Sequence, residues 1–146
     1  MTIKLDIIPP TRTAQQKGAF PYIGRDGRAH TRFYRKAEVQ EAEAFLAGLL
    51  KPYKPEQPIT EPVALGVVFC FPYRASEKKS ITRRAITVPH TVRPDLDNLE
   101  KGLLDTLTRL GFWRDDNLIW SKVTHKLRGP KPFLKITIIP FSERTK

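Results

Sequence analysis

The chain has 146 residues and a formal net charge of +11, from 26 Lys and Arg against 15 Asp and Glu. That length suits a single domain, residues 1–146, with its own hydrophobic core. The sequence has no apolar run of about 18 residues and no signal-like start, so it indicates neither a membrane span nor a secretion signal, and with only Cys70 as cysteine it allows no intrachain disulfide. We therefore expect a cytoplasmic protein, and a pI near 10.0 favours nucleic acid over membrane as its partner.

The first fifty residues are expected to form a strand, a hairpin and a helix. Apolar and polar residues alternate over 2–8, which predicts a half-buried strand, and the polar residues 11–19 follow as a loop. Segments 20–23 and 30–34 flank an Asp-Gly pair, a strong β-hairpin signal. Basic and aromatic residues interleave in this hairpin, a pattern that suits phosphate contact and base stacking, although strand aromatics more often belong to a core. Helical spacing of apolar residues predicts a helix over 36–50.

The middle of the chain changes from apolar to basic. After a proline-rich connector at 51–62, the most apolar run, 63–71, predicts a central strand buried on both faces. A short strand is expected at 81–88. The segment 74–93 is predicted to be a mobile basic loop that grips DNA phosphates, the alternative being an ordinary solvated loop. Its candidate DNA-binding residues are Arg74, Lys78, Lys79, Arg83, Arg84 and Arg93.

A helix with a leucine stripe is predicted to follow Pro94, a residue that suits a helix start, and to end at Gly111. Asp95 or Asp97 is positioned to cap it, and Asp97 with Glu100 has the spacing of a capping box. The apolar stripe consists of Leu96, Leu99, Leu103, Leu107 and Leu110, and the opposite face carries Asp97, Lys101, Asp105 and Thr108.

The acidic residues of this basic chain are concentrated in one short window. Six of the fifteen acids fall in residues 95–116, so this window has a net charge of −3 while the remainder has +14. A divalent cation between the carboxylates and a polyanion explains the concentration, since Mg²⁺ prefers carboxylate and phosphate oxygens. Helix capping, i, i+4 ion pairs and a turn are the alternative explanation. The six acids are Asp95, Asp97, Glu100, Asp105, Asp115 and Asp116.

Two strands are expected after this segment, at 117–125 and 133–139. His90 and His125 are candidate proton carriers, although a solvent-facing or hydrogen-bonded strand histidine is the more common case. The order of elements predicts an α/β fold of the α+β type, with a mostly antiparallel mixed sheet and two main helices packed on it.

The acidic segment resembles the signature of the RusA family of Holliday-junction resolvases. That signature is an Asp-x-Asp-Asn-Leu-x-Lys element followed by an Asp-Asp pair. The matching residues here are Arg93-Pro94-Asp95-Leu96-Asp97-Asn98-Leu99-Glu100-Lys101, then Asp105, Gly111-Phe112-Trp113 and Asp115-Asp116.

The resemblance implies a RusA-like fold and a homodimeric, Mg²⁺-dependent endodeoxyribonuclease, bacterial or phage-encoded, that nicks four-way DNA junctions in recombination and repair. It implies catalytic roles for Asp95, Asp97, Lys101 and Asp116, with Asp115 as a further acidic position. We expect Asp95, Asp97 and Asp116 to bind the metal, with Asp115 as an optional ligand, Mn²⁺ as a substitute ion and no organic cofactor. The competing hypotheses are a non-catalytic basic nucleic-acid-binding protein and a nuclease for other branched DNA.

Overall fold

The computed structural model describes residues 1–12 and 17–142. The expected loop at 11–19 lies partly outside these residues, and its last three residues already belong to a strand. The strands are β1 Thr2–Leu5, β2 Lys17–Ile23, β3 Ala29–Arg35, β4 Val63–Pro72, β5 Val88–Pro89, β6 Ile119–Gly129 and β7 Phe133–Pro140. The helices are α1 Ala37–Leu50, α2 Lys79–Arg83 and α3 Leu96–Leu110, with 3-10 turns η1 Lys51–Tyr53 and η2 Asp116–Leu118.

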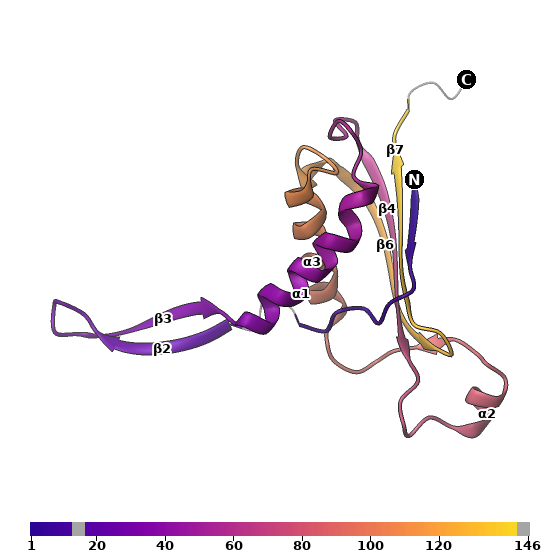
Figure 1. Ribbon diagram of the computed structural model, residues 1–146, viewed down its shortest axis with the longest axis horizontal. Coiled ribbons are helices and arrows are strands. Elements are labelled where there is room, and N and C mark those ends of the chain that lie inside the picture. The colour runs from indigo at the N-terminus through magenta and orange to yellow at the C-terminus, as the bar shows by residue number, and fades with distance from the viewer. Residues whose placement is uncertain (13–16, 143–146) are drawn as a thin grey trace.

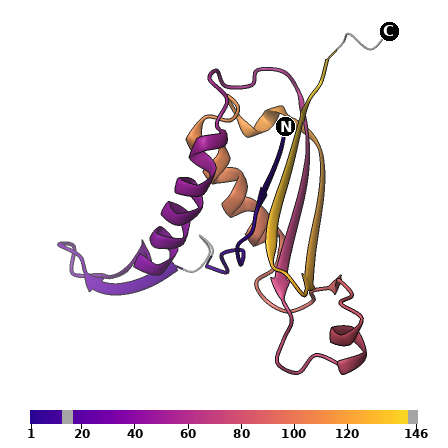
Figure 2. The ribbon, with the colours of Figure 1, turned by 45° about the vertical axis from the view of Figure 1, so that its right-hand side comes forward.

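A five-stranded sheet in the order β1-β7-β4-β6-β5 forms the body, and β2 pairs with β3 in a separate hairpin. Only the β4–β6 pair is parallel, while the other neighbours in this sheet are antiparallel. The helices α1 and α3 both lie on one face of the sheet (Figures 1 and 2). The predicted fold class is therefore confirmed. The two strands that follow α3 do not pair with each other, because β4 lies between them.

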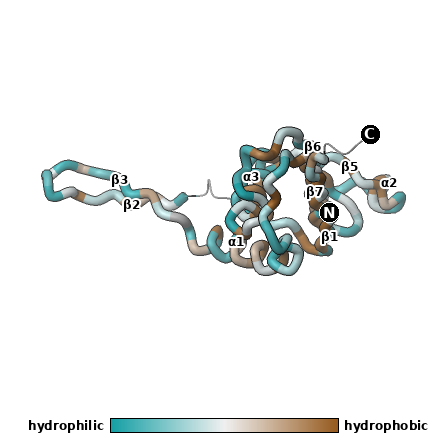
Figure 3. The backbone as a smooth tube through the Cα atoms, turned by 90° about the horizontal axis from the view of Figure 1, so that it is seen from above, coloured by the Kyte–Doolittle hydropathy of each residue, from teal (hydrophilic) through white to brown (hydrophobic). Residues whose placement is uncertain are grey.

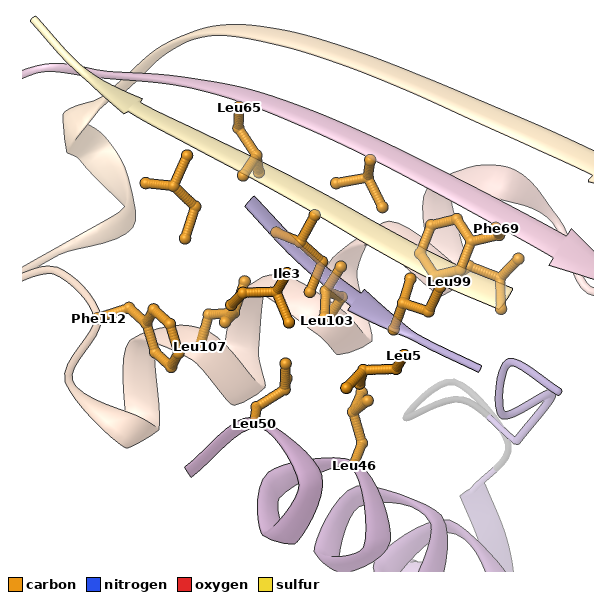
Figure 4. Packing of buried hydrophobic residues seen from close by; sticks show 14 of the residues in the cluster. Ile3, Leu5, Leu46, Leu50, Leu65, Phe69, Leu99, Leu103, Leu107 and Phe112 are labelled. Atoms are coloured by element: carbon orange, nitrogen blue, oxygen red, sulfur yellow. The ribbon is translucent and has the colours of Figure 1, made fainter. Parts of the chain in front are cut away.

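The core lies between this helical layer and the sheet. Leu99, Leu103 and Leu107 recur every fourth residue of α3, so they face the sheet together, and all three are buried. Leu46 and Leu50 of α1 belong to the same cluster (Figure 4). The predicted leucine stripe is thus the feature that fixes α3 against the sheet.

The expectation that β4 is buried on both faces is wrong. Val63, Leu65 and Val67 point toward the helices and are buried, whereas Ala64 and Gly66 on the opposite face are half-buried. Among the described residues no helix covers that second face (Figure 2). The run is apolar because β4 is central in the sheet, and its small residues let the uncovered face tolerate partial exposure.

The basic segment 74–93 contains a short helix where a strand was expected. Helix α2 occupies residues 79–83, and pairing with β6 is limited to Val88 and Pro89. The backbone N–H of His90 adds one further hydrogen bond to β6, to the carbonyl of Lys126. The six candidate DNA-binding residues are all exposed: Arg74, Lys78, Lys79, Arg83, Arg84 and Arg93.

One ion pair anchors the base of this segment to the sheet. Arg128 of β6 donates from Nη2 to Glu77 Oε1 at 3.0 Å, and also donates to the carbonyl of Pro89. Both charged side chains are almost fully buried, at 10% and 5% exposure. Tyr73 adds a hydrogen bond of 2.6 Å from its hydroxyl to the carbonyl of Ile86. The loop is therefore held at its two ends while its cations face solvent.

The hairpin of β2 and β3 stands away from the body and connects directly to α1 (Figures 1 and 3). Its register is regular over seven pairs, from Lys17–Arg35 to Ile23–Ala29. The predicted hairpin is confirmed, with each strand longer than expected. None of the described helices is long and apolar enough to cross a membrane.

We expect Leu103→Ala to lower the free energy of unfolding by about 2–5 kcal/mol, because Leu103 is fully buried between α3 and the sheet. Urea unfolding followed by circular dichroism measures this. Leu110→Ala, at the half-buried end of the same stripe, is the matched control and should cost less. Equal losses would show that α3 is not docked through the centre of its leucine stripe.

Glu77→Gln tests the buried ion pair through pH. The hydrogen bond from Arg128 lowers the pKa of Glu77 below its ordinary value of 4.5, so the folded chain favours the charged form. The pair therefore stabilises the fold fully above that ordinary value, and the contribution disappears as pH falls through the lowered folded pKa. In thermal unfolding from pH 7 to pH 3, the variant should start with a lower midpoint and show a smaller acid-induced decline. The exposed Glu41→Gln should behave like the unsubstituted chain, and a wild-type acid decline in Glu77→Gln would contradict this assignment.

Candidate functional site

The start of α3 presents two carboxylates that the fold does not use. Asp95 occupies the N-cap position with extended backbone angles (φ −66°, ψ 148°), but its side chain makes no capping hydrogen bond. Asp97 lies in the first turn and is exposed. Within residues 1–12 and 17–142, neither carboxylate takes part in a hydrogen bond or an ion pair. The capping alternative therefore does not account for these two acids.

Lys126 of β6 fixes the backbone in front of this helix. Its Nζ donates to the carbonyl oxygens of Val92 and Pro94, each at 2.7 Å, on both sides of the cis Arg93–Pro94 bond. The backbone N–H of His90 donates to the carbonyl of Lys126 at 2.9 Å. Because Asp95 directly follows Pro94, Lys126 positions the first of the two free carboxylates.

Glu100 has a structural role instead of the predicted capping role. It accepts a hydrogen bond from Thr124 Oγ1 and pairs with Lys122 Nζ at 3.0 Å, and its side chain is only 13% exposed. Both partners lie on β6. Glu100 therefore holds α3 against the edge of the sheet and is not available as a ligand.

A bulge at Trp120 directs these β6 side chains toward the helix layer. Val63 pairs with Ile119, but the next residue, Ala64, pairs with Ser121, so β6 holds one extra residue. A bulge of this kind reverses which side chains face which side of a sheet. From this point Lys122, Thr124, Lys126 and Arg128 lie on the side of the sheet that α3 covers.

The second acidic pair is delivered by a loop that is well anchored. Phe112 and Trp113 are buried, and the backbone N–H of Arg114 donates to the carbonyl of Ile59 at 3.1 Å. Asp115 Oδ1 accepts from the backbone N–H of Asn117 at 2.8 Å, which caps η2. Asp115 is thus partly used by the fold, and the turn alternative holds for this residue.

Asp116 remains exposed and lies beside the body of α3. It lines a shallow hollow of about 390 Å³ together with Leu104, Lys122 and other residues of η2 and β6. Leu104 and Asp97 are seven residues apart, so they lie on the same side of α3, about 10 Å apart along its axis. Asp116 and Asp97 therefore share one side of the helix but are separated along it.

The described part of the chain contains no group of three or more His, Cys, Asp or Glu residues arranged to hold a metal ion. A single chain therefore does not gather Asp95, Asp97 and Asp116 into a closed metal cage. Their convergence on a shared cation stays a prediction.

The basic loop and the acidic helix start are both held by β6. Lys101 is exposed one turn after Asp97, and Asp105 is exposed one turn further on. The loop that carries α2 and the entry to α3 are both fixed by β6, through Arg128 and Lys126 respectively. Two residues of a strand span about 7 Å, so the basic loop and the free carboxylates are anchored at neighbouring points.

His90 differs from the expected solvent-facing or hydrogen-bonded histidine. It is 9% exposed, stacks on Phe71 with ring centroids 4.9 Å apart, and its Nδ1 has no hydrogen-bond partner among the described residues. Burial, followed by the charge of Lys126 and Arg128, lowers the pKa of His90. Its imidazole is neutral at neutral pH and acts as core, while His125 is exposed as expected.

Sequence analysis missed Lys122, Lys126 and Arg128 as residues that organise the site. They fall on alternate positions of β6, so the signal was a basic face on one strand. A basic face is typical of the solvent-exposed side of a strand, and only the bulge in β6 shows that this face is turned toward α3.

Comparison with known proteins gives a consistent family. A family profile described as endodeoxyribonuclease RusA matches residues 9–139. A crossover junction endodeoxyribonuclease of Lactococcus phage r1t is 30% identical over 139 residues, covering 92% of each chain. The Escherichia coli crossover junction endodeoxyribonuclease RusA is 53% identical over 53 residues, which cover 34% of this chain and 44% of that protein. The uncharacterised protein YqaN of Bacillus subtilis is 28% identical over 119 residues, covering 78% of this chain and 81% of YqaN.

Because the profile spans most of the chain and the phage relative aligns over nearly its full length, the match includes β4, β5 and β6 of the sheet together with the basic loop and α3. The chain belongs to the RusA family of endodeoxyribonucleases, nucleases that hydrolyse phosphodiester bonds in DNA.

Proposed function

We propose that this chain is a Mg²⁺-dependent nuclease that resolves four-way DNA junctions by paired nicks, in recombination and repair. The observation that carries the proposal is the pair of free carboxylates, Asp95 and Asp97, at an anchored helix start beside a basic loop. Two relatives support the substrate class, since both bear the name crossover junction endodeoxyribonuclease.

The donor chemistry fits Mg²⁺. This ion is commonly bound by one or two carboxylates, with water and substrate phosphate oxygens completing its octahedron. Asp95 and Asp97 would supply those carboxylates, and Asp116, which the free chain holds further along α3, would have to approach them to complete the site. When bound, the ion supplies a water of lowered pKa and stabilises negative charge at the scissile phosphate.

Lys101 has an electrostatic role in this proposal. It follows Asp97 by one helical turn, is exposed and has no partner among the described residues, so its ammonium group is free to approach a phosphate. A lysine side chain contributes a compact positive charge with three donors. Lys101 would therefore bind a phosphoryl oxygen and stabilise the charge that develops there during cleavage.

The exposed cations of the α2 loop would hold the DNA backbone. Phosphate contacts fix position and orientation without selecting a base sequence. Because Glu77 is engaged by Arg128, the segment presents no free carboxylate to oppose them. The contacting residues are Arg74, Lys78, Lys79, Arg83, Arg84 and Arg93.

Paired nicks require two sites. A four-way junction has an approximate two-fold axis, and a two-fold homodimer presents two equivalent active sites related in the same way. We therefore propose that the working form is a homodimer in which each chain nicks one strand. A non-catalytic nucleic-acid-binding role leaves the free carboxylates unexplained, whereas a nuclease for other branched DNA shares the site and differs in substrate.

Asp97→Asn tests the assignment of the site. With Mg²⁺ and a synthetic four-way junction, the variant should cut at least about 100-fold more slowly, because a metal ligand is removed. Junction binding should persist or tighten, since one repulsive charge is removed. The matched control is Asp6→Asn, which changes an exposed carboxylate directly after β1. Normal cutting by Asp97→Asn would overturn the site.

The same assay compares substrates and ions. The unsubstituted chain should cut the four-way junction in preference to matched duplex, flap and RNA, and Mn²⁺ should replace Mg²⁺. Preferred cutting of the flap would favour the alternative branched-DNA nuclease.

Arg83→Ala with Arg84→Ala tests the basic loop. For each phosphate that the variant no longer neutralises, the slope of log affinity against log salt should fall by about 0.9, and binding should weaken similarly on junction and duplex. Filter binding at several salt concentrations measures both quantities. Lys51→Ala, an exposed cation at the end of α1, is the control, and an unchanged slope in the double variant would exclude the loop from the DNA interface.

A further inference from the structure

The projecting hairpin has one face built from aromatic and cationic side chains. Paired residues of an antiparallel ladder share a face. The register therefore groups Gly18 with Tyr34, Phe20 with Arg32, and Tyr22 with His30 on one side of the ribbon.

Local contacts order this face before any partner arrives. The rings of Tyr22 and His30 stack with centroids 5.5 Å apart, and the Tyr34 ring lies directly over Gly18, where a Cβ would clash with it. His30 in turn is hydrogen-bonded to Asp26 at 3.0 Å. Phe20 beside them is 60% exposed. The rings are thus arranged along the ribbon yet remain open to solvent.

The hairpin lacks the burial that normally stabilises such a ribbon. An isolated two-stranded hairpin is at best marginally stable in water. Here the ribbon stands clear of the sheet and helices (Figure 3), and Phe33 and Ile23 on its other face are also largely exposed. Exposed aromatic residues on a projecting element are typical of a binding surface.

Charge identifies the partner. Residues 17–35 contain five Lys and Arg residues and one acid, a net charge of +4 within a chain of +11. The acid, Asp26, is engaged by His30 and by the backbone N–H of Arg28. A second copy of the same ribbon would be repelled, whereas a polyanion would be attracted. The partner is therefore nucleic acid.

Aromatic faces distinguish branched from continuous DNA. In an intact duplex the bases stack on one another, and a ribbon in the major groove contacts only base edges and phosphates. At a branch point the stack is interrupted and base faces become available to aromatic side chains. Each strand of the hairpin extends about 20 Å, enough to reach from the protein body into the branch.

We propose that the Phe20–Tyr22 face of the hairpin enters the branch point and stacks on the bases exposed there, with Arg32 binding an adjacent phosphate. The hairpin is then the element that selects branched over continuous DNA, and it is separate from the residues that would cleave the strand. The inference rests on the proposed junction-resolving function.

The test is a double variant, Phe20→Ala with Tyr22→Ala, measured without divalent metal so that no cleavage occurs. Its affinity for a four-way junction should fall about tenfold or more, while its affinity for duplex of the same arm sequence should change by less than about twofold. Fluorescence of 2-aminopurine placed at the crossover should change on binding the unsubstituted chain but not the variant. Phe141→Ala, an exposed aromatic residue just after β7, is the matched control. Circular dichroism should be unchanged, because the altered side chains are exposed.

Three outcomes overturn the inference. Unchanged junction affinity would show that the hairpin does not enter the branch, and equal losses on junction and duplex would make it a general DNA contact. A fall in sedimentation mass would make it a dimer arm. If the unsubstituted chain itself shows no preference for the junction, the proposed function fails as well, so the two failures are distinguishable.

Discussion

The contact between β6 and the helical layer is the constraint on which the site depends. One extra residue at Trp120 turns the polar side of β6 toward α3, where Lys122 pairs with Glu100 and Lys126 binds the carbonyls in front of Asp95. Arg128, two residues further, holds Glu77 of the basic loop. These contacts fix three segments at once, and the buried guanidinium of Arg128 in particular needs its partner. Without the bulge, the same cations would face away from α3 and the helix start would lose its anchor.

This arrangement divides the acidic residues into two groups. Glu77, Glu100 and Asp115 are engaged by an arginine, by a lysine and a threonine, and by a backbone N–H. Asp95 and Asp97 are left without partners among the described residues, on a backbone that Lys126 and Glu100 hold in place. The helix dipole offers these carboxylates only a small stabilisation, and the neighbouring acids oppose it by repulsion. Placing two unpaired carboxylates side by side is understandable where the site binds a cation.

Local sequence patterns were sufficient for the elements whose stabilising contacts are local or periodic. The leucine stripe of α3, its end at Gly111 (φ 84°) and the hairpin around the Asp-Gly turn were all predictable. The insertion of β4 between β6 and β7 was not, because strand pairing depends on residues far apart in the chain. For the same reason the sequence could not reveal that Lys126 faces the helix. The roles of Glu100 and Asp115 also required the structure, since capping and ligation use the same side chains.

Affinity and cleavage have different physical origins in this chain. The exposed cations of the α2 loop and the hairpin attract any polyanion, through a term that is long-ranged and independent of sequence. The free carboxylates repel the same polyanion unless a cation intervenes, so DNA is able to bind the protein without entering the site. Under the proposed function, a junction satisfies both requirements when its branch brings a phosphate to the start of α3. Because electrostatic attraction does not distinguish branch from duplex, selection of the substrate must come from shape and from the groups that contact unstacked bases.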